Sequence, residues 1–333
     1  MNLTGIIWLD GLLFAGVLAI CIAVGALVAV WLERKVSALA QDRLGPMEVG
    51  RYHGVLQTIA DALKLLQKED IVPKAADRFL HILAPGIVMG GVIAAAVVIP
   101  WAADAIPADL NIGIFYFAAI SSLGVIGILL AGWGSNNKWA LFGALRAVAQ
   151  IVSYEIPAGL VLLAAVIFAG SLSTVDIVQS QAGGFWNWML FRAFPFNFIG
   201  MVVFFLAAIA ETNRAPFDMP EAESELVAGY HVEYSGMRFA IFFLAEYGAI
   251  FMAVAMLSVV YLGGWHAPFP FLDFLPGVFW MVLKVFLLTN FVILVRWSLP
   301  RVRVDQLMTI SWKYLTPIAF VCVLGAGAMA LLP

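Results

Sequence analysis

Four of the long apolar segments of this sequence contain or end on a glutamate, a residue that can bind and release protons. These residues are Glu33, Glu155, Glu211 and Glu246. A charged side chain inside a bilayer costs about 2.5–3.5 kcal/mol on insertion scales, so such residues usually face a bundle interior or a wet cavity. A single one is as often a structural contact between helices. Four of them in four segments favour a chain of carboxylates that relays protons near pH 7, because burial disfavours the charged form.

A second group of acidic residues lies between two apolar segments, in residues 211–238. The acidic residues of this segment are Glu211, Asp218, Glu221, Glu223, Glu225 and Glu233. Pro220 followed by acidic residues is typical of a helix start, where Glu221 and Glu225 would lie one turn apart on one face. The apolar residues between the acids predict a folded segment that packs against its neighbours rather than a loose polar loop.

The composition indicates that a membrane surrounds most of the chain. Of the 333 residues, 63% are hydrophobic and only 12% are charged, whereas a soluble domain carries about a quarter charged residues. A helix crosses the hydrocarbon core in about 20 apolar residues. The sequence therefore predicts a single all-α, polytopic membrane domain over residues 1–333, with eight spans. The predicted spans are 11–32, 80–101, 113–132, 143–170, 191–211, 238–262, 275–296 and 312–332.

The positive charges indicate how the spans are oriented. Sixteen of the eighteen lysines and arginines fall in loops of one parity, and such loops face the cytoplasm. Both termini are then expected on the outer, periplasmic side. The first ten residues include Asp10 and no basic residue, so a cleaved secretory signal is not expected.

One inside loop contains an amphipathic segment, residues 54–68. Val55, Leu56, Ile59, Leu63 and Leu66 share one helical face, and the charged residues lie on the other. This pattern carries too many charges to span the membrane and suits a helix that lies in the interface plane. On the pattern alone, a helix that merely anchors the loop is at least as good an interpretation as a functional one.

Several classes of site are excluded by the residues that the chain lacks. Its two cysteines, Cys21 and Cys322, both lie in apolar segments, and they are too few for a disulfide framework, a structural zinc site or an iron–sulfur cluster held by this chain alone. The four histidines are scattered, which disfavours a haem with two histidine ligands. No phosphate-binding loop, dinucleotide fingerprint or nucleophile motif is present. The net charge of −3 argues against a nucleic-acid partner.

Five segments resemble a known family of membrane proteins. They are ERKVSALAQDRLGP (33–46), QTIADALKLLQKED (57–70), GALRAVAQIVSYEI (143–156), ETNRAPFDMPEAESELVAGYHVEYS (211–235) and PRVRVDQLMTISWKYLTP (300–317). They look like the quinone-module membrane subunits of respiratory complex I, which are the H subunits of the bacterial enzymes and chain 1 of the mitochondrial ones. The resemblance covers nearly the whole chain, and the 25-residue acidic match is very specific.

The resemblance implies a place in a larger enzyme. In that family the subunit lies at the heel of the L-shaped NADH:quinone oxidoreductase, under a peripheral arm whose subunits carry NADH, flavin and iron–sulfur clusters. The resemblance implies that this chain binds no cofactor by itself, takes ubiquinone as substrate and has the other complex I subunits as partners. The expected location is a bacterial inner membrane or a mitochondrial inner membrane.

The resemblance also implies roles for individual residues. Those expected at the quinone cavity or its mouth are Arg34, Asp61, Lys64, Phe217 and Arg296. Those expected to couple quinone reduction to proton movement are Glu33, Glu155, Glu211, Glu221, Glu223, Glu225 and Glu246. Neither a strictly catalytic residue nor a metal site is expected.

Two other functions stay open at this point. The first is a homologous membrane subunit of a proton-translocating, membrane-bound hydrogenase, although such relatives typically match the ETNRxPFD and PRxRxDQ segments less completely. The second is a secondary transporter, but transporters usually show internal repeats and paired broken helices, and this sequence shows none. A simple membrane anchor would not need Glu155 or Glu246 within its spans.

Overall fold

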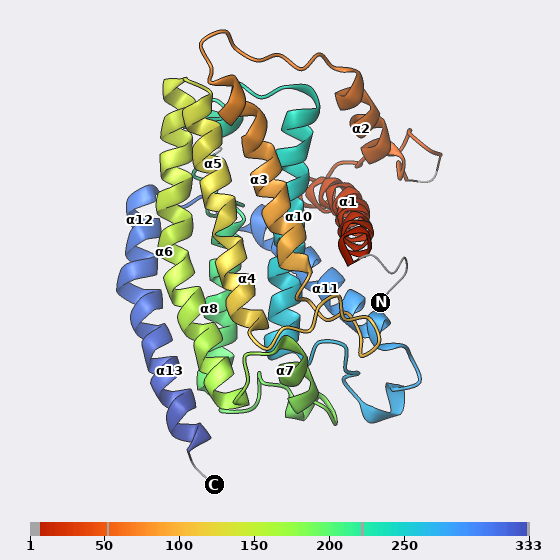
Figure 1. Ribbon diagram of the computed structural model, residues 1–333, viewed down its shortest axis with the longest axis vertical. Helices are drawn as coiled ribbons and strands as arrows, with labels where there is room; N and C mark the ends of the chain where they lie inside the picture. Colours follow the sequence, from red (N-terminus) through yellow and green to blue (C-terminus); the bar gives the residue numbers. More distant parts are fainter. Residues whose placement is uncertain (1–6, 52, 221–222, 332–333) are drawn as a thin grey trace.

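The computed structural model of the chain describes residues 7–51, 53–220 and 223–331, which form helices and loops without a β-strand. The expected all-α fold is confirmed. In Figure 1 α3, α5, α6, α8, α10 and α13 run side by side as a bundle, α1 is seen almost end-on and so crosses them, and α2 is set apart. The bounds of the α-helices are α1 (Ile7–Ala40), α2 (Gln57–Gln67), α3 (Arg78–Ala96), α4 (Gly113–Ser121), α5 (Leu123–Gly134), α6 (Lys138–Ala169), α7 (Thr174–Ser180), α8 (Phe196–Glu211), α9 (Glu223–Leu226), α10 (Gly236–Tyr261), α11 (Gly277–Ser298), α12 (Val304–Thr309) and α13 (Thr316–Ala330).

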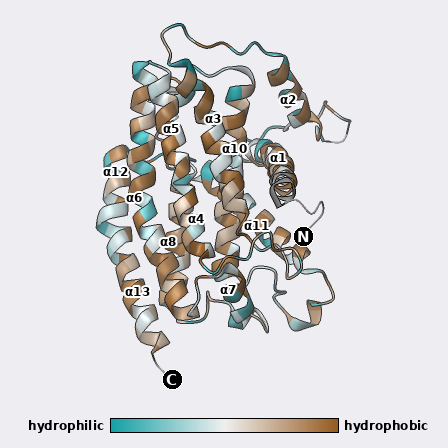
Figure 2. Ribbon diagram, in the orientation of Figure 1, coloured by the Kyte–Doolittle hydropathy of each residue, from teal (hydrophilic) through white to brown (hydrophobic). Residues whose placement is uncertain are grey.

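Seven helical segments of the described residues are long and apolar enough to cross a membrane. Figure 2 shows that apolar residues predominate along these helices. One span combines α4 with α5 and another combines α12 with α13, joined by a π-helical segment at Ile310–Leu315. The predicted span 191–211 corresponds to α8, which has only 16 residues. The described part of the chain therefore has seven segments of full spanning length and one shorter apolar helix.

The shortness of α8 brings its last residues into the middle of the bundle. A helix of 16 residues is about 24 Å long, less than the ~30 Å hydrocarbon core. Gln150 of α6 donates hydrogen bonds to the Ala210 carbonyl, at 2.7 Å, and to Asn213 Oδ1, at 3.2 Å. Gln150 lies twelve residues after Lys138, the first residue of α6, or about 18 Å along that helix. The last residues of α8 are thus far from Lys138, where α6 begins.

At one end of the bundle α3, α6 and α10 begin and α5 ends (Figure 1); we call it the inner end, after the orientation predicted above. The amphipathic helix α2 lies beside this end in Figure 1. Ile59, Leu63 and Leu66 of α2 are all exposed. An apolar face open on one side of a helix is the arrangement expected for a helix at the membrane interface.

The acidic segment after α8 folds against α6. It contains α9 and a 3-10 turn, Gly229–His231, and both contact α6. A Cβ atom on Gly143 of α6 would lie 2.7 Å from the Gly229 Cα, which is closer than real Cβ contacts. Only glycine at position 143 permits this backbone approach. The prediction of a folded, packed segment holds for its described residues.

Candidate functional site

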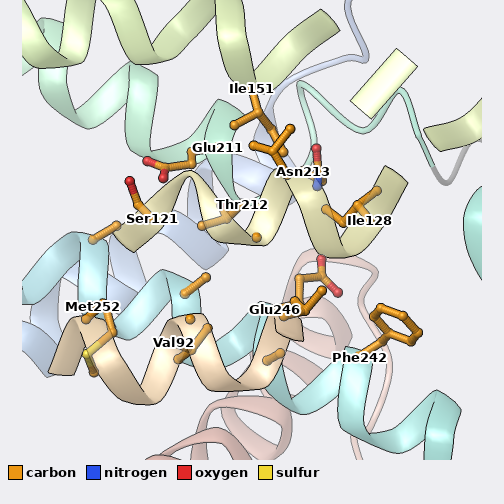
Figure 3. A pocket seen from close by; sticks show the side chains of 18 of the residues that line it. Val92, Ser121, Ile128, Ile151, Glu211, Thr212, Asn213, Phe242, Glu246 and Met252 are labelled. Atoms are coloured by element: carbon orange, nitrogen blue, oxygen red, sulfur yellow. The ribbon is translucent and has the colours of Figure 1, made fainter. Parts of the chain in front are cut away.

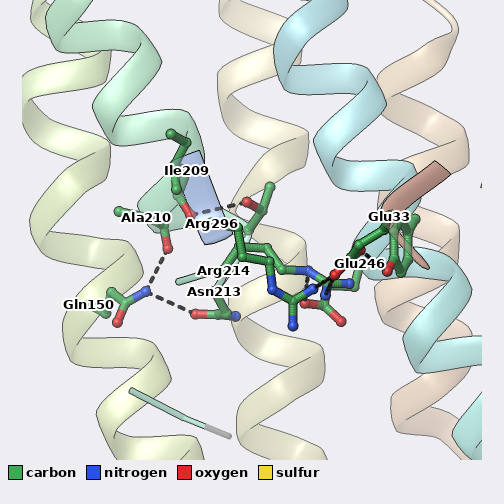
Figure 4. Close-up of polar contacts among 10 residues, drawn as sticks. Glu33, Gln150, Ile209, Ala210, Asn213, Arg214, Glu246 and Arg296 are labelled. Carbon is green, nitrogen blue, oxygen red and sulfur yellow. Dashed lines mark hydrogen bonds and ion pairs between the residues drawn. The ribbon is translucent and has the colours of Figure 1, made fainter. Parts of the chain in front are cut away.

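A buried cluster of charged residues lies where α1, α10, α11 and the segment after α8 meet. We define the ion cluster as Glu33 of α1, Arg214, Glu246 and Tyr247 of α10, and Arg296 of α11 (Figure 4). Arg214 Nε lies 2.6 Å from Glu246 Oε1, and Arg214 Nη1 lies 3.9 Å from Glu33 Oε1. Glu33 also forms an ion pair with Arg296 and accepts a hydrogen bond from the Tyr247 hydroxyl.

Burial makes the contacts inside the ion cluster strong. Arg214 is 4% exposed, and Glu33 and Glu246 are each 8% exposed. The guanidinium carbon of Arg214 lies 4.3 Å from the centre of the Tyr247 ring, so the cation also faces an aromatic surface. The two carboxylates and two guanidinium groups of the cluster have a formal net charge of zero. Charges this deep are tolerated when they are paired, and a change in one of them alters the energy of the others.

A cavity of about 90 Å³ lies next to the ion cluster, and we call it the central cavity. Residues of α3, α4, α5, α6 and α10, Tyr230 and the segment Glu211–Asn213 line it (Figure 3). Glu211 and Glu246 both reach it. Its lining is mostly apolar, with Ser121, Glu211, Thr212, Asn213, Tyr230 and Glu246 as the polar residues. Its volume exceeds the roughly 10–15 Å³ that one water needs on the same measure.

Glu211 lies at the break between α4 and α5 because α8 ends early. Figure 3 shows its carboxylate beside the Ser121 hydroxyl at the end of α4. Glu155 is half-buried on α6 and is not among the residues that line the cavity. The structure thus brings Glu33, Glu246 and Glu211 into one region, formed by the ion cluster and the central cavity.

Glu225 lies apart from the central cavity, on the surface of the inner end. Arg146 Nη1 donates a hydrogen bond of 2.5 Å to Glu225 Oε2, and Arg301 Nη2 lies 3.8 Å from Oε1. The hydrogen bond from Arg146 lowers the pKa of the Glu225 carboxyl group. Glu221 lies outside the described residues, and the side chain of Glu223 does as well.

The residues expected at the quinone cavity fall into separate places. Arg34 and Asp61 form an ion pair of 2.6 Å between α1 and α2, with the arginine 41% and the aspartate 34% exposed. Lys64 is exposed on the same helix, α2. Successive helix residues point about 100° apart, which explains why Glu33 enters the bundle while its neighbour Arg34 faces α2.

The other two expected cavity residues, buried Phe217 and half-buried Arg296, have partners elsewhere in the protein. Phe217 is 5% exposed, and its ring centre lies 5.4 Å from that of Tyr154 on α6. Arg296 pairs with Glu33 in the ion cluster. Arg34, Asp61 and Lys64 therefore form one group at α1 and α2, whereas Phe217 and Arg296 contact other partners.

Sequence reasoning missed two members of the ion cluster. Arg214 counted only as a positive charge of an inside loop, and Tyr247 was not singled out at all. Arg214 comes three residues after Glu211, within the ETNR sequence, which was the available signal. Nothing in the sequence around Tyr247 indicates a bond to Glu33.

Comparisons with known proteins give the family of this chain. Residues 13–327 match the family model described as NADH dehydrogenase. A protein of Chlorobaculum parvum, named as the H subunit of NADH-quinone oxidoreductase, is 53% identical over 322 residues, which cover 93% of this chain and 89% of that protein. Proteins of the same name from Chlorobaculum tepidum and Anaeromyxobacter dehalogenans are 55% identical over 301 residues and 47% identical over 325 residues. They cover 87% and 91% of this chain, and this chain covers 83% and 78% of them. The chain therefore belongs to the NADH dehydrogenase family.

Proposed function

We propose that this chain is the membrane subunit of a proton-translocating NADH-quinone oxidoreductase, where it couples the reduction of quinone to the movement of protons. The observation that carries the proposal is the junction of the ion cluster with the central cavity, which brings together Glu33, Glu246 and Glu211 from three helices. The chain contributes to an oxidoreductase as one subunit of it. NADH, flavin and iron–sulfur clusters belong to partner subunits in this proposal.

The quinone headgroup is proposed to approach the group formed by Arg34, Asp61 and Lys64. Apolar residues of α2 are exposed beside these polar residues, and an isoprenoid tail needs an apolar surface while the headgroup needs a few polar partners. Phe217 and Arg296 act here as supports of the neighbouring segments rather than as contacts of the headgroup. Ubiquinone is the proposed substrate.

The charge of the reduced quinone then changes the energy of the charges in the ion cluster. Two-electron reduction leaves the quinone negatively charged until it takes up protons. At a separation of about 10 Å and an effective dielectric constant of 20, one charge changes the energy of another by about 1.7 kcal/mol, more than one pKa unit. Glu33 is the first acid of this route after the quinone site, because it is the neighbour of Arg34 on α1.

The route continues through the arginine bridge into the cavity. A change in the charge of Glu33 weakens or strengthens the ion pair between Arg214 and Glu246. Glu246 and Glu211 both line the central cavity, and we propose that waters in it carry protons between them, with Glu155 as the next acid of the route. Glu221, Glu223 and Glu225 are proposed to modulate the quinone end of this route from the acidic segment.

The proposal places the chain in a bacterial inner membrane as a multi-pass protein, with the quinone site on the cytoplasmic side and both termini on the periplasmic side. A mitochondrial inner membrane is the equivalent in other cells. Its partners are the other subunits of the oxidoreductase. The names of the relatives favour this function over the hydrogenase subunit and the transporter.

Replacing Glu246 or Glu211 with glutamine tests the proposal. Each variant keeps the shape of the side chain but cannot carry a proton, so we expect the protons pumped per electron to fall about tenfold or more, as for other essential proton-transfer groups. The measurement is proton uptake by proteoliposomes that contain the assembled complex, during NADH oxidation.

Asp104→Asn is the matched control, because Asp104 is exposed in the segment between α3 and α4. It should pump as the wild type does. Full pumping by both glutamine variants, with normal assembly, would overturn the proposal.

A further inference from the structure

A second cavity, of about 370 Å³, lies at the end of the bundle opposite the inner end, and we call it the outer pocket. The segment after α7, the segment between α10 and α11, and the start of α11 form its walls. Figure 1 shows α7 and the segment between α10 and α11 at this end. The lining includes Trp265, His266, Asp273, Gly277 and Trp280. The outer pocket is larger than the central cavity and shares no lining residue with it, so the route above does not use it.

Lys284 of α11 holds one wall of the outer pocket in place. Its Nζ donates hydrogen bonds to the backbone carbonyls of Leu262, Gly264 and His266, at 2.7, 2.8 and 2.8 Å. These are the three hydrogen bonds that an ammonium group can donate. Nζ also lies 4.4 Å from the centre of the Trp188 ring. Lys284 does not line the pocket, so it fixes the wall and has no N–H left for a ligand.

One part of the outer pocket suits a cation. Asp273 is exposed and lines the pocket, and its carboxylate forms no ion pair within residues 7–51, 53–220 and 223–331. Trp265 and Trp280, which are 7% and 8% exposed, line the same pocket. The faces of indole rings attract cations, ammonium groups among them. An ammonium group in the pocket would therefore meet a carboxylate together with aromatic side chains.

The start of α11 suits an anion. α11 begins at Gly277, which lines the pocket, and no side chain caps its first turn. The first N–H groups of a helix have no partner within the helix and form the positive end of its dipole. Trp280 offers one more donor, because its Nε1 is buried and has no hydrogen-bond partner in the described part of the chain. The outer pocket thus has groups for an anion beside groups for a cation.

Exposed apolar side chains lie next to the outer pocket and continue along α11. Phe271 and Phe274, in the segment that contains Asp273, are 73% and 77% exposed. On α11 the side chains of Phe279, Val282 and Phe286 are exposed, and their spacing of three and four residues places them on one face of the helix. This face leads from the outer pocket into the membrane-spanning part of α11, where lipid acyl chains can contact it.

We propose that the outer pocket binds the headgroup of a phospholipid that carries a primary ammonium group, as phosphatidylethanolamine does. The ammonium group pairs with Asp273, the phosphate lies at the start of α11, and the acyl chains follow the exposed face of α11. Such a headgroup has a positive and a negative charge a few atoms apart, which matches the two parts of the pocket. A lipid with only a negative charge leaves Asp273 without a partner, and a quaternary ammonium group has no N–H to donate to it. This inference does not depend on the proposed function.

The test uses the assembled complex with Phe274 replaced by the photoreactive residue p-benzoyl-phenylalanine, in nanodiscs of phosphatidylethanolamine and phosphatidylglycerol in equal parts. Mass spectrometry of the chain after illumination identifies the molecule that is attached. We expect phosphatidylethanolamine to predominate. Its yield should fall about fivefold or more in Asp273→Asn, because a charge-assisted hydrogen bond is lost. Trp280→Phe, which keeps a ring but has no N–H, should lower the yield about twofold or more. Phosphatidylcholine in place of phosphatidylethanolamine should be attached less as well.

Asp104→Asn is the matched control, because Asp104 is an exposed aspartate in the segment between α3 and α4 and does not line the outer pocket. It should give the yield of the wild type. Three results overturn the inference. The first is equal yield in Asp273→Asn and Asp104→Asn, and the second is attachment of phosphatidylglycerol or phosphatidylcholine as readily as of phosphatidylethanolamine. The third is attachment mainly to a peptide of another subunit, which would make this surface a protein interface.

Discussion

Arg214 is the residue on which the arrangement of the acids depends most. It is the one described side chain that contacts both Glu33 and Glu246 in an ion pair, and it lies over the Tyr247 ring. Two carboxylates buried at this depth would repel each other without a cation between them. Arg214 therefore both stabilises the junction of α1 and α10 and transmits charge between the two acids.

Replacement of Arg214 with methionine should destabilise the protein strongly. Removing one partner of a buried ion pair typically costs about 3–5 kcal/mol, because the other charge stays buried without compensation. The midpoint of thermal inactivation of the assembled complex measures the effect. Arg78→Met is the control, since Arg78 is exposed at the start of α3, and a surface change of this kind costs about 0.5 kcal/mol or less. Equal stability of the two variants would contradict the role given to Arg214.

The contact between Glu225 and Arg146 should depend on pH in a defined direction. The hydrogen bond from Arg146 lowers the pKa of Glu225 in the folded chain, from an ordinary value of 4.5. A carboxyl group with a lowered pKa contributes stability above its unfolded pKa and loses that contribution as the pH falls through the folded pKa. Hydrogen exchange of residues 223–235 should therefore be slower in the wild type than in Arg146→Gln at pH 7, and the difference should shrink as the pH falls below 4.5 and through the lowered pKa of Glu225. Exchange that is equal in the two proteins at pH 7 would show that the contact does not order the segment.

Among the helices, α8 and α6 decide where the functional residues lie. The early end of α8 places Glu211 beside Ser121 and the chain after it beside Gln150. The following residues then return along α6, past Arg146 and Gly143, to Asn137 near its start. One face of α6 thus positions the whole acidic segment.

Gly143→Ala should disturb that face of α6. The added Cβ would lie 2.7 Å from the Gly229 Cα, so the backbone of the acidic segment must move. Overpacking of this kind costs about 1–3 kcal/mol. Thermal inactivation of the complex and its rate of quinone reduction measure the effect, and both should fall.

Gly159→Ala on the same helix is the matched control, because no atom lies within 4 Å of the added Cβ. It should be neutral or stabilise by up to about 1 kcal/mol through helix propensity. A Gly143→Ala variant that behaves like Gly159→Ala would show that the close approach of the segment is unimportant.

At the scale of the whole molecule, hydropathy and amphipathic pattern predicted the all-α class and the interface helix α2. The search for acids in apolar segments found Glu33, Glu246 and Glu211, and the structure places them in one region because α1, α8 and α10 pack there. The all-α class is confirmed, and it could be predicted because it depends on local sequence, namely apolar runs and helical periods. The roles assigned to the acids stay predictions.

What the sequence did not predict depends on three-dimensional packing. Among the eight predicted spans, the segment 191–211 forms the shorter helix α8, because hydropathy does not show where a helix stops within an apolar run. The position of Arg214 depends on where α8 ends, and for this reason the sequence did not predict its part in the ion cluster. Family resemblance assigned five residues to a quinone cavity. Arg34, Asp61 and Lys64 form one group at α1 and α2, whereas Phe217 and Arg296 contact other partners. This division depends on how the helices pack, so the sequence could not predict it.

The central claim is that quinone reduction changes the protonation of the buried carboxylates, and infrared difference spectroscopy of the complex measures this directly. Reduction of bound quinone by NADH should change the carbonyl stretching band of protonated carboxyl groups, and this change should be lost in part in Glu246→Gln and in Glu211→Gln. Asp104→Asn should give the wild-type difference spectrum. A spectrum in which quinone is reduced and the carboxyl bands of all four proteins stay the same would contradict the account.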